Sequence, residues 1–215
     1  MQYKLINPVD KEYSALEQVL VNRGIPYEEI DRFLNLDDSV LHSLDKLEGL
    51  RDAAQVLARH LSIDQGKIYV QVDCDTDGFT ASALLLNYLH RIVPSIVESR
   101  FYYGIHEDKT HGICEENILE DTCLVIVPDA SSNEYDTHKR LREEGIDIII
   151  LDHHEADYTS PYAVVVNNQL CDYPNKNLSG VGVVYKFCQY LDNLFGVSYA
   201  NDFLDLVAIG LNQLG

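Results

Sequence analysis

The sequence predicts an α/β protein: a parallel, doubly wound β-sheet with helices on both faces, preceded by an α-helical N-terminal region. Three observations support this prediction. After residue 66, apolar runs of strand length alternate with helical segments. Those runs are apolar throughout, whereas the first 66 residues show helical periodicity. Fully apolar strands in a βαβα order are typical of a parallel sheet that is covered on both faces.

Residues 1–66 are expected to form a helical region packed on the core, and residues 67–215 the α/β domain. Residues 22–26 contain Gly24 and Pro26, a pattern typical of one helix ending and the next beginning. Further on, five apolar residues are spaced by three and four positions: Leu47, Leu50, Ala54, Leu57 and Leu61. This spacing predicts an amphipathic helix.

The α/β region divides into strands and helices by the same criteria. Strands are expected at the apolar runs of residues 68–72, 124–127, 146–151 and 163–166. Helices are expected at residues 79–92, 134–144, 180–194 and 203–211. Gly145 directly follows one predicted helix, where glycine is common because it tolerates a left-handed backbone.

Polar residues follow the predicted strands immediately. They are Asp73, Asp75, Asp77, Asp129, Asp152, His153, His154, Asn167 and Asn168. In open α/β sheets, ligands bind outside the carboxyl ends of the strands. The sequence therefore predicts that several strands deliver these side chains to one edge of the sheet.

The composition of the chain restricts the classes of protein to which it can belong. The 215 residues are 46% hydrophobic and 24% charged, which is typical of a globular chain. The longest apolar runs are far shorter than the roughly 18 residues of a membrane span, and no signal-like stretch opens the sequence. Five cysteines stand without a CxxC pair, which argues against a disulfide framework or a zinc knuckle. We expect a cytoplasmic protein with no membrane partner.

The net charge opposes nucleic-acid binding. Sixteen Lys and Arg stand against 35 Asp and Glu, a formal charge of −19. Such a chain repels a polyanion at long range unless metal ions or local cations offset the carboxylates. The cations expected to lie along a bound strand are Arg100, Lys109, Lys139, Arg140, Arg142 and Lys176.

Three aspartates alternate in the run from Asp73 to Asp77, so their side chains point the same way on an extended segment. Like charges side by side are costly without a cation, although a solvated acidic turn is the simpler alternative. An EF-hand is excluded because Leu84 stands where its loop requires glutamate. Carboxylates with imidazoles suit Mn²⁺ or a related ion, and two such ions sharing a carboxylate can activate water for phosphoester attack.

These segments resemble a known family. Residues 73–78, 127–129 and 151–155 resemble motifs I, II and III of the DHH phosphoesterase family in order and spacing. Residues 22–25 and 173–183 are similar to the corresponding regions of RecJ-type single-strand exonucleases. The resemblance covers about residues 20 to 210.

The resemblance implies roles for individual residues. The implied metal ligands are Asp75, Asp77, Asp129 and His153, with Asp129 bridging two ions. The implied catalytic residues are His154, which would face the scissile phosphate, and Asp152, which would orient the site. The implied substrate contacts are His106, His111, Ser179, Gly180 and Gly182, the last three at a helix start suited to phosphate.

The sequence also departs from the family pattern. Gln71 stands where a histidine often precedes motif I, and Leu214 stands where the motif IV aspartate is expected. The C-terminal substrate-binding domain typical of the family is not evident. We therefore expect weak or partial metal occupancy, and either a missing C-terminal domain or a protein partner.

The expected function is a Mn²⁺-dependent (or Mg²⁺-dependent) phosphodiesterase with a two-metal site. The resemblance implies a RecJ-like exonuclease that degrades single-stranded DNA from the 5′ end. One alternative is a DHH phosphodiesterase acting on short oligonucleotides, cyclic dinucleotides or pyrophosphate. Another is a catalytically impaired DHH protein that binds nucleic acid or a partner.

Overall fold

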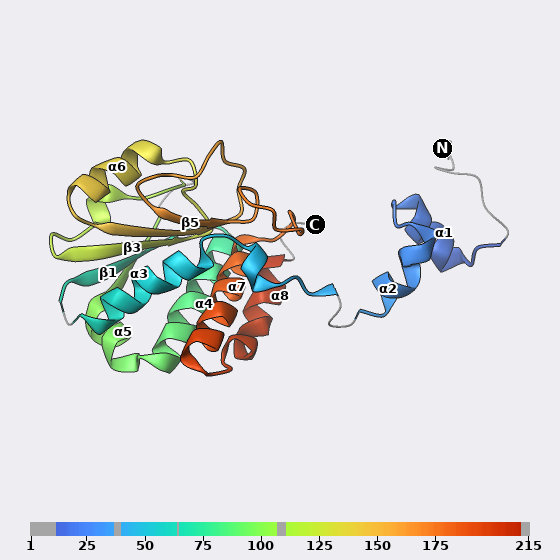
Figure 1. The fold of residues 1–215 in the computed structure, drawn as a ribbon, viewed down its shortest axis with the longest axis horizontal. Helices are drawn as coiled ribbons and strands as arrows, with labels where there is room; N and C mark the ends of the chain where they lie inside the picture. Colours follow the sequence, from blue (N-terminus) through green and yellow to red (C-terminus); the bar gives the residue numbers. More distant parts are fainter. Residues whose placement is uncertain (1–11, 37–39, 64, 107–110, 212–215) are drawn as a thin grey trace. The chain divides into compact units, whose positions relative to one another are not determined.

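The computed structural model describes residues 12–36, 40–63, 65–106 and 111–211. The chain divides into two compact units, Met1–His42 and Ser43–Gly215 (Figure 1). In the first unit, α1 (Ala15–Asn22) is followed by η1 (Tyr27–Glu29) and α2 (Ile30–Leu34). Ser14 begins α1 with a capping box, in which it exchanges hydrogen bonds with Glu17.

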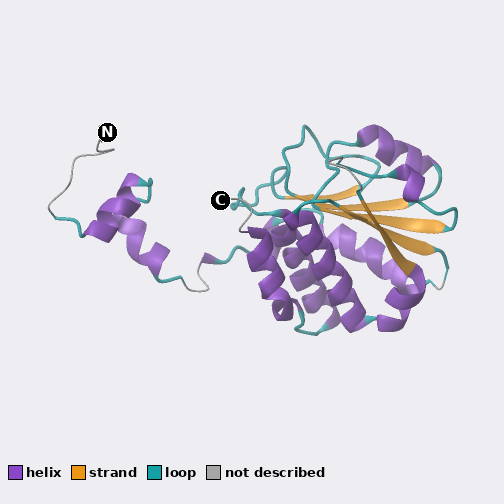
Figure 2. Cartoon of the chain, turned by 180° about the vertical axis from the view of Figure 1, so that it is seen from behind, coloured by secondary structure: helices purple, strands orange, loops and turns teal. Residues whose placement is uncertain are grey.

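The second unit contains a parallel sheet, as the sequence predicts. Its strands are β1 (Lys67–Val72), β2 (Phe101–Ile105), β3 (Thr122–Pro128), β4 (Asp147–Asp152) and β5 (Val164–Asn167). They pair in the order β2-β1-β3-β4-β5, and every pairing is parallel. Figure 2 shows the strands side by side in one sheet, in orange. From β1 the chain continues to β2 on one side, whereas β3, β4 and β5 follow on the other side of β1. The topological switch point therefore lies between β1 and β3.

Helices cover both faces of the sheet, which confirms the doubly wound prediction. One face carries α3 (Leu50–Ser62), α4 (Thr76–Ile92), α5 (Pro94–Arg100), α7 (Gly180–Phe195) and α8 (Leu204–Leu211). The other face carries α6 (Tyr135–Glu143) (Figure 1). Short turns of 3₁₀ helix occur at η3 (Leu44–Lys46), η4 (Glu115–Asn117) and η5 (Ala200–Phe203).

The division between the units lies at residue 42, whereas the sequence places the helical region as far as residue 66. Helix α3 explains the difference, because Leu50 and Leu57 are buried in the core of the second unit together with Leu84 and Phe187. The buried guanidinium of Arg100 also donates hydrogen bonds to carbonyls at the end of α3 and beyond it, including those of His60 and Ile63.

Two elements were not predicted from the sequence, namely α5 and the edge strand β2. The β2 sequence contains Gly104 and leaves side chains such as Tyr103 exposed, so it lacks the continuous apolar run of the other strands. Pairing with β1 stabilises it as a strand.

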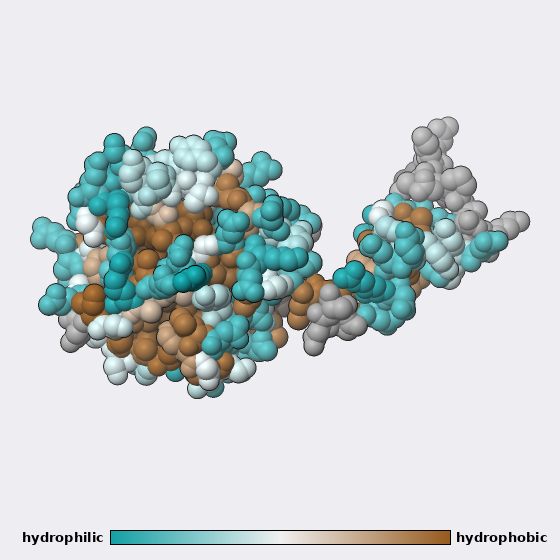
Figure 3. Space-filling view, in the orientation of Figure 1, coloured by the Kyte–Doolittle hydropathy of each residue, from teal (hydrophilic) through white to brown (hydrophobic). Residues whose placement is uncertain are grey.

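The surface of the second unit mixes hydrophilic and hydrophobic residues on the face seen in Figure 3. Across the described part of the chain, we find no helix with both the length and the apolar character that crossing a membrane requires.

Candidate metal centre

Acidic and imidazole side chains meet where β1, β3 and β4 end. Asp73 follows β1, Asp129 follows β3, and Asp152 is the last residue of β4. Strands β1 and β3 are neighbours in the sheet but run on to opposite sides of it, which is the switch point where open α/β sheets bind ligands. The predicted convergence of strand ends is therefore present.

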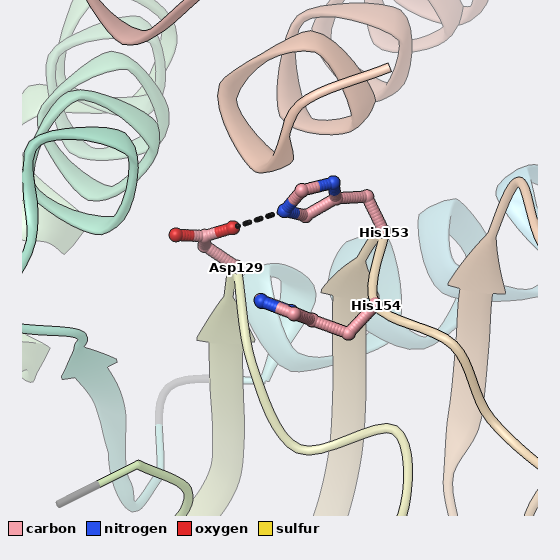
Figure 4. A group of neighbouring side chains, drawn as sticks. All are labelled: Asp129, His153 and His154. Atoms are coloured by element: carbon pink, nitrogen blue, oxygen red, sulfur yellow. Dashed lines mark ion pairs between the residues drawn. The ribbon is translucent and has the colours of Figure 1, made fainter. Parts of the chain in front are cut away.

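Asp129 lies at the middle of this edge and has unusual geometry. Its backbone is left-handed, with φ of 68°, and its side chain is only 1% exposed. Its buried Oδ1 makes no hydrogen bond within the described residues, and the nitrogen paired with it is His153 Nε2 at 3.3 Å (Figure 4). A strained residue that holds an unsatisfied carboxylate oxygen indicates a functional site.

A glycine makes room for Asp129. A Cβ on Gly180 would lie 2.0 Å from Asp129 Oδ1, so any side chain there would displace the carboxylate. The start of α7 and the end of β3 can approach this closely only because residue 180 is glycine.

Two groups of potential metal ligands share Asp129. In one, ligand atoms of Asp129, His153 and His154 all lie within 4.8 Å of one another; in the other, those of Asp73, Asp75 and Asp129 do. Figure 4 shows the first group, with both imidazoles projecting from the end of β4 towards the carboxylate. Carboxylate oxygens combined with imidazole nitrogens form a donor set that suits Mn²⁺-type ions. The residues present therefore fit a divalent cation, and Asp129, which carries the unsatisfied oxygen, belongs to both groups.

The pKa shifts of Asp129 and His153 also favour a cation at this site. Burial, together with the negative charge of Asp77, raises the pKa of Asp129 to about 7, although contact with His153 opposes this shift. Burial disfavours the charged form of His153, but Asp129 and Asp77 outweigh it and raise the pKa of that imidazole. A bound cation would stabilise the ionised carboxylates that burial penalises.

Asp152 orients the two histidines. Its buried Oδ1 accepts hydrogen bonds from the backbone N–H of His153 at 2.7 Å and from His154 Nδ1 at 2.7 Å, while Oδ2 accepts from the N–H of Ser132. Burial opposes its charge, but the hydrogen bonds from His154 and Ser132 lower the pKa of Asp152 to about 2. In return, Asp152 raises the pKa of His154 to about 9. His154 is thus held as an imidazolium.

Asp77, predicted as a ligand, contacts the start of α7, and its role as a ligand stays a prediction. Its two oxygens accept hydrogen bonds from the N–H groups of Gly180 and Val181 at 2.7 and 2.8 Å, at the start of α7. Burial raises its pKa, and these hydrogen bonds oppose the shift. Asp77 Oδ2 lies 3.7 Å from His153 Nε2, but Asp77 belongs to neither ligand group.

The expected phosphate site at Ser179, Gly180 and Gly182 lies at this helix start, and its role in binding substrate stays a prediction. The N–H of Gly180 is taken by Asp77, and that of Gly182 donates to Ser179 Oγ at 3.2 Å. A carboxylate of the chain itself therefore contacts the start of this helix, at the N–H groups of Gly180 and Val181.

The two predicted loop histidines have different positions. His106 is buried, and its ring nitrogens contact the carbonyl of Gly112 at 2.8 Å and the sulfur of Cys114 at 3.4 Å. His111 is 66% exposed, and its Nδ1 lies 2.9 Å from Asp73 Oδ2. His111 therefore lies beside Asp73 and lines the neighbouring cavity, and its contact with substrate stays a prediction.

Asp73, which the sequence places at this edge, is not among the metal ligands that the resemblance implies. It is buried and belongs to the ligand group of Asp75 and Asp129. The alternation of aspartates in the run that begins at Asp73 was the available signal. Gln71, in contrast, is no ligand here, because its amide contacts Tyr69 Oη and the N–H of Cys114.

A cavity of about 360 Å³ lies beside the two histidines. Its walls are His111, Gly112, Ala130, Ser131, Ser132, Asn133, Glu134, Asp152 and His154. No lysine or arginine lines it among the described residues. The cavity adjoins the candidate metal centre and is large enough for a substrate group.

The cations expected along a bound strand are mostly paired within the chain. Arg140 contacts Glu115, Arg142 contacts Asp147, and Lys139 lies 3.9 Å from Glu143. Lys176 donates to backbone carbonyls, Arg100 is buried, and Lys109 lies outside the described residues. Leu214, where the motif IV aspartate is expected, also lies outside them.

The fold and this edge define a class: a doubly wound α/β domain with a candidate metal centre at its topological switch point. The chain belongs to the DHH family, since residues 67–211 match the model described as "DHH family, N-terminal domain".

Two curated relatives and one solved structure are similar to the chain. YorK from the SPbeta prophage of Bacillus subtilis, named as a single-strand DNA-specific exonuclease, is 43% identical over 211 residues, 98% of this chain and 36% of YorK. The single-stranded-DNA-specific exonuclease RecJ of Bacillus subtilis is 31% identical over 98% of this chain and 28% of RecJ. The structure of Thermus thermophilus RecJ with Mn²⁺ has a TM-score of 0.68 and 26% identity, over 89% of this chain and 27% of that one. The chain thus spans about a third of the length of the curated relatives.

Proposed function

We propose that this chain provides the phosphodiesterase site of a divalent-metal-dependent exonuclease that degrades single-stranded DNA in the 5′-to-3′ direction. The observation that carries the proposal is the buried, unsatisfied oxygen of Asp129, shared by two groups of ligand-type side chains. The names of YorK and RecJ support the substrate, and the Mn²⁺ in the RecJ structure supports the choice of manganese.

The ligands that we propose are Asp75, Asp129 and His153, together with Asp73. Asp77 remains a candidate, because each carboxylate oxygen has two lone pairs and can accept an N–H while also binding an ion. Bound metal ions would supply Lewis acidity and a water of lowered pKa at the edge of the sheet.

His154 and Asp152 act on the substrate side. Asp152 holds His154 Nδ1, so that Nε2 of the imidazolium is left for a phosphate oxygen. Because the side chain is 57% exposed and lines the cavity, it can approach the negative charge that develops on the phosphate during hydrolysis. His111, whose Nδ1 is held by Asp73, is proposed to contact substrate from the opposite wall.

A second candidate is a phosphodiesterase for short substrates such as oligonucleotides of a few residues or cyclic dinucleotides. The observation that favours it is the pairing of the surface cations, which leaves little positive charge to track a long strand.

One experiment separates the candidates. The chain is incubated with Mn²⁺ and, in parallel, with end-labelled single-stranded DNA, a cyclic dinucleotide and pyrophosphate, with Asp129→Asn as the control. We expect DNA to be shortened, and a 5′ end capped with phosphorothioate linkages to block the reaction while a capped 3′ end does not. Cleavage of only the small phosphates would replace the first proposal by the second, and identical rates for Asp129→Asn would reject both.

Calorimetric titration with Mn²⁺ tests the metal ligands separately. We expect Asp129→Asn to weaken binding by at least about 100-fold, because loss of even an outer partner of a metal ligand costs about 10–100-fold. His154→Gln should leave binding nearly unchanged. Equal losses of affinity in both variants would show that His154 is a ligand.

A further inference from the structure

Two tyrosines form an exposed stack near the candidate metal centre. Tyr135 begins α6, and Tyr158 lies in the segment between β4 and β5. Their ring centroids are 4.0 Å apart and their planes differ by 10°. Tyr158 is 54% exposed, so much of an aromatic side chain is presented to solvent instead of to the core.

Hydrogen bonds hold this pair in place. The Tyr135 hydroxyl lies 3.0 Å from Asn133 Oδ1 and 3.1 Å from the carbonyl of Tyr158, and it accepts the N–H of Tyr158 at 3.3 Å. Asn133 Nδ2 in turn donates to the carbonyl of Glu155. The rings are therefore ordered before any ligand arrives, which reduces the entropy lost on binding.

The pair adjoins the substrate cavity. Asn133, which bonds to Tyr135, is itself a wall of the cavity that His154 and His111 line. A strand that leaves the cavity on the side of Asn133 would therefore meet this stack.

Charge also favours an aromatic contact here. The chain carries −19, and the surface cations near α6, Arg140 and Arg142, are paired with carboxylates. Base stacking needs no positive charge and tolerates any base sequence, because every base has a π-face.

We propose that Tyr135 and Tyr158 form a stacking platform for a base of a single-stranded nucleic acid, next to the nucleotide in the cavity. The proposal rests on the proposed function for its substrate. In this proposal the base stacks on the exposed ring of Tyr158, and the ring of Tyr135 packs against the other face of Tyr158.

The first test compares binding and turnover in Tyr158→Ala, Tyr158→Phe and the control Tyr103→Ala, which removes a 61% exposed tyrosine from β2. Binding of a fluorescein-labelled oligothymidylate of about 12 nucleotides is followed by anisotropy. Tyr158→Ala should weaken it about tenfold, within the range of one base–aromatic stack, while Tyr158→Phe and Tyr103→Ala stay within about twofold. Hydrolysis of thymidine 5′-(p-nitrophenyl) phosphate, which has no neighbouring base, should be unchanged in all three.

The second test removes the base instead of the ring. Oligonucleotides with one abasic residue at successive positions should show one position where wild-type binding falls about tenfold, and Tyr158→Ala should lose nothing further there. The platform would be overturned if Tyr158→Ala lost as much affinity as the wild type when the base at that position is removed. It would also be overturned if no abasic position weakened binding by the wild type. Failure of the wild type to hydrolyse any substrate would reject the proposed function, while the binding series would still decide the platform.

Discussion

At the scale of single residues, Asp129 determines how the site responds to pH. Its pKa of about 7 in the metal-free chain lies well above the ordinary value near 4. Between these values the folded chain binds one more proton than the unfolded chain, so the free energy of unfolding falls as pH rises from about 4 to about 7.

We therefore predict that Asp129→Asn flattens the pH dependence of stability. Thermal unfolding in chelator is measured between pH 5 and 8 for both proteins. The wild type should lose more stability than the variant across this range, and added Mn²⁺ should restore the wild type alone. Parallel curves in chelator would show that Asp129 ionises normally.

The pairing of Asp152 with His154 gives a second prediction at this scale. Because the Asp152 carboxylate raises the pKa of His154 to about 9, this ring contributes stability that is fully present below about pH 6.5 and lost as pH rises through about 9. Asp152→Asn should move the titration of His154 down towards 6.5. Carbon-detected NMR of the imidazole, assigned with His154→Gln, measures both values. A ring that titrates near 6.5 in the wild type would show that the pair does not form.

At the scale of elements, the contact between α7 and β3 depends on a glycine. A Cβ at Gly180 would lie 2.0 Å from Asp129 Oδ1, whereas the nearest atom to a Cβ at Gly182 is the flexible end of Leu178, at 3.3 Å, followed by Ser179 Oγ at 3.5 Å. The two glycines lie two residues apart in α7, so substitutions at them can be compared directly.

We predict that Gly180→Ala destabilises the chain by about 1–3 kcal/mol and weakens Mn²⁺ binding, because the helix must move away from the carboxylate. Gly182→Ala should change stability by less than about 1 kcal/mol and keep the metal affinity. Chemical denaturation and calorimetry measure the two effects. Equal behaviour of the two variants would show that α7 shifts freely relative to β3.

At the scale of the whole molecule, charge controls how nucleic acid is held. The chain carries −19, and Lys139, Arg140 and Arg142 are paired with carboxylates. We predict a shallow salt dependence for single-stranded DNA, with a slope of log K against log salt no steeper than about −1.5, the value for about two phosphate contacts. Anisotropy titrations between low and moderate salt measure it. A slope near −4 would reveal a cationic groove that these residues do not form.

Much of the fold could be predicted because its signals are local. The apolar runs at β3, β4 and β5 are continuous, and that at β1 is interrupted only by Gln71; a strand buried on both faces favours such a run wherever it lies in the sheet. The edge strand β2 lacks that signal, since half-exposed residues such as Tyr103 meet no such requirement.

The sequence by itself determined which side chains reach the edge of the sheet, because a side chain that directly follows a parallel strand must lie at that strand's end. Only the tertiary structure decided their partners. Asp77 contacts amides about a hundred positions further along the chain, and Asp73 pairs with His111 across a loop. These contacts depend on how α7 and the segment with His111 pack near the end of β1. No local periodicity in the sequence specifies which distant residues meet there. For the same reason α3, helical by its own pattern, belongs to the second unit through the core that it shares with α4 and α7.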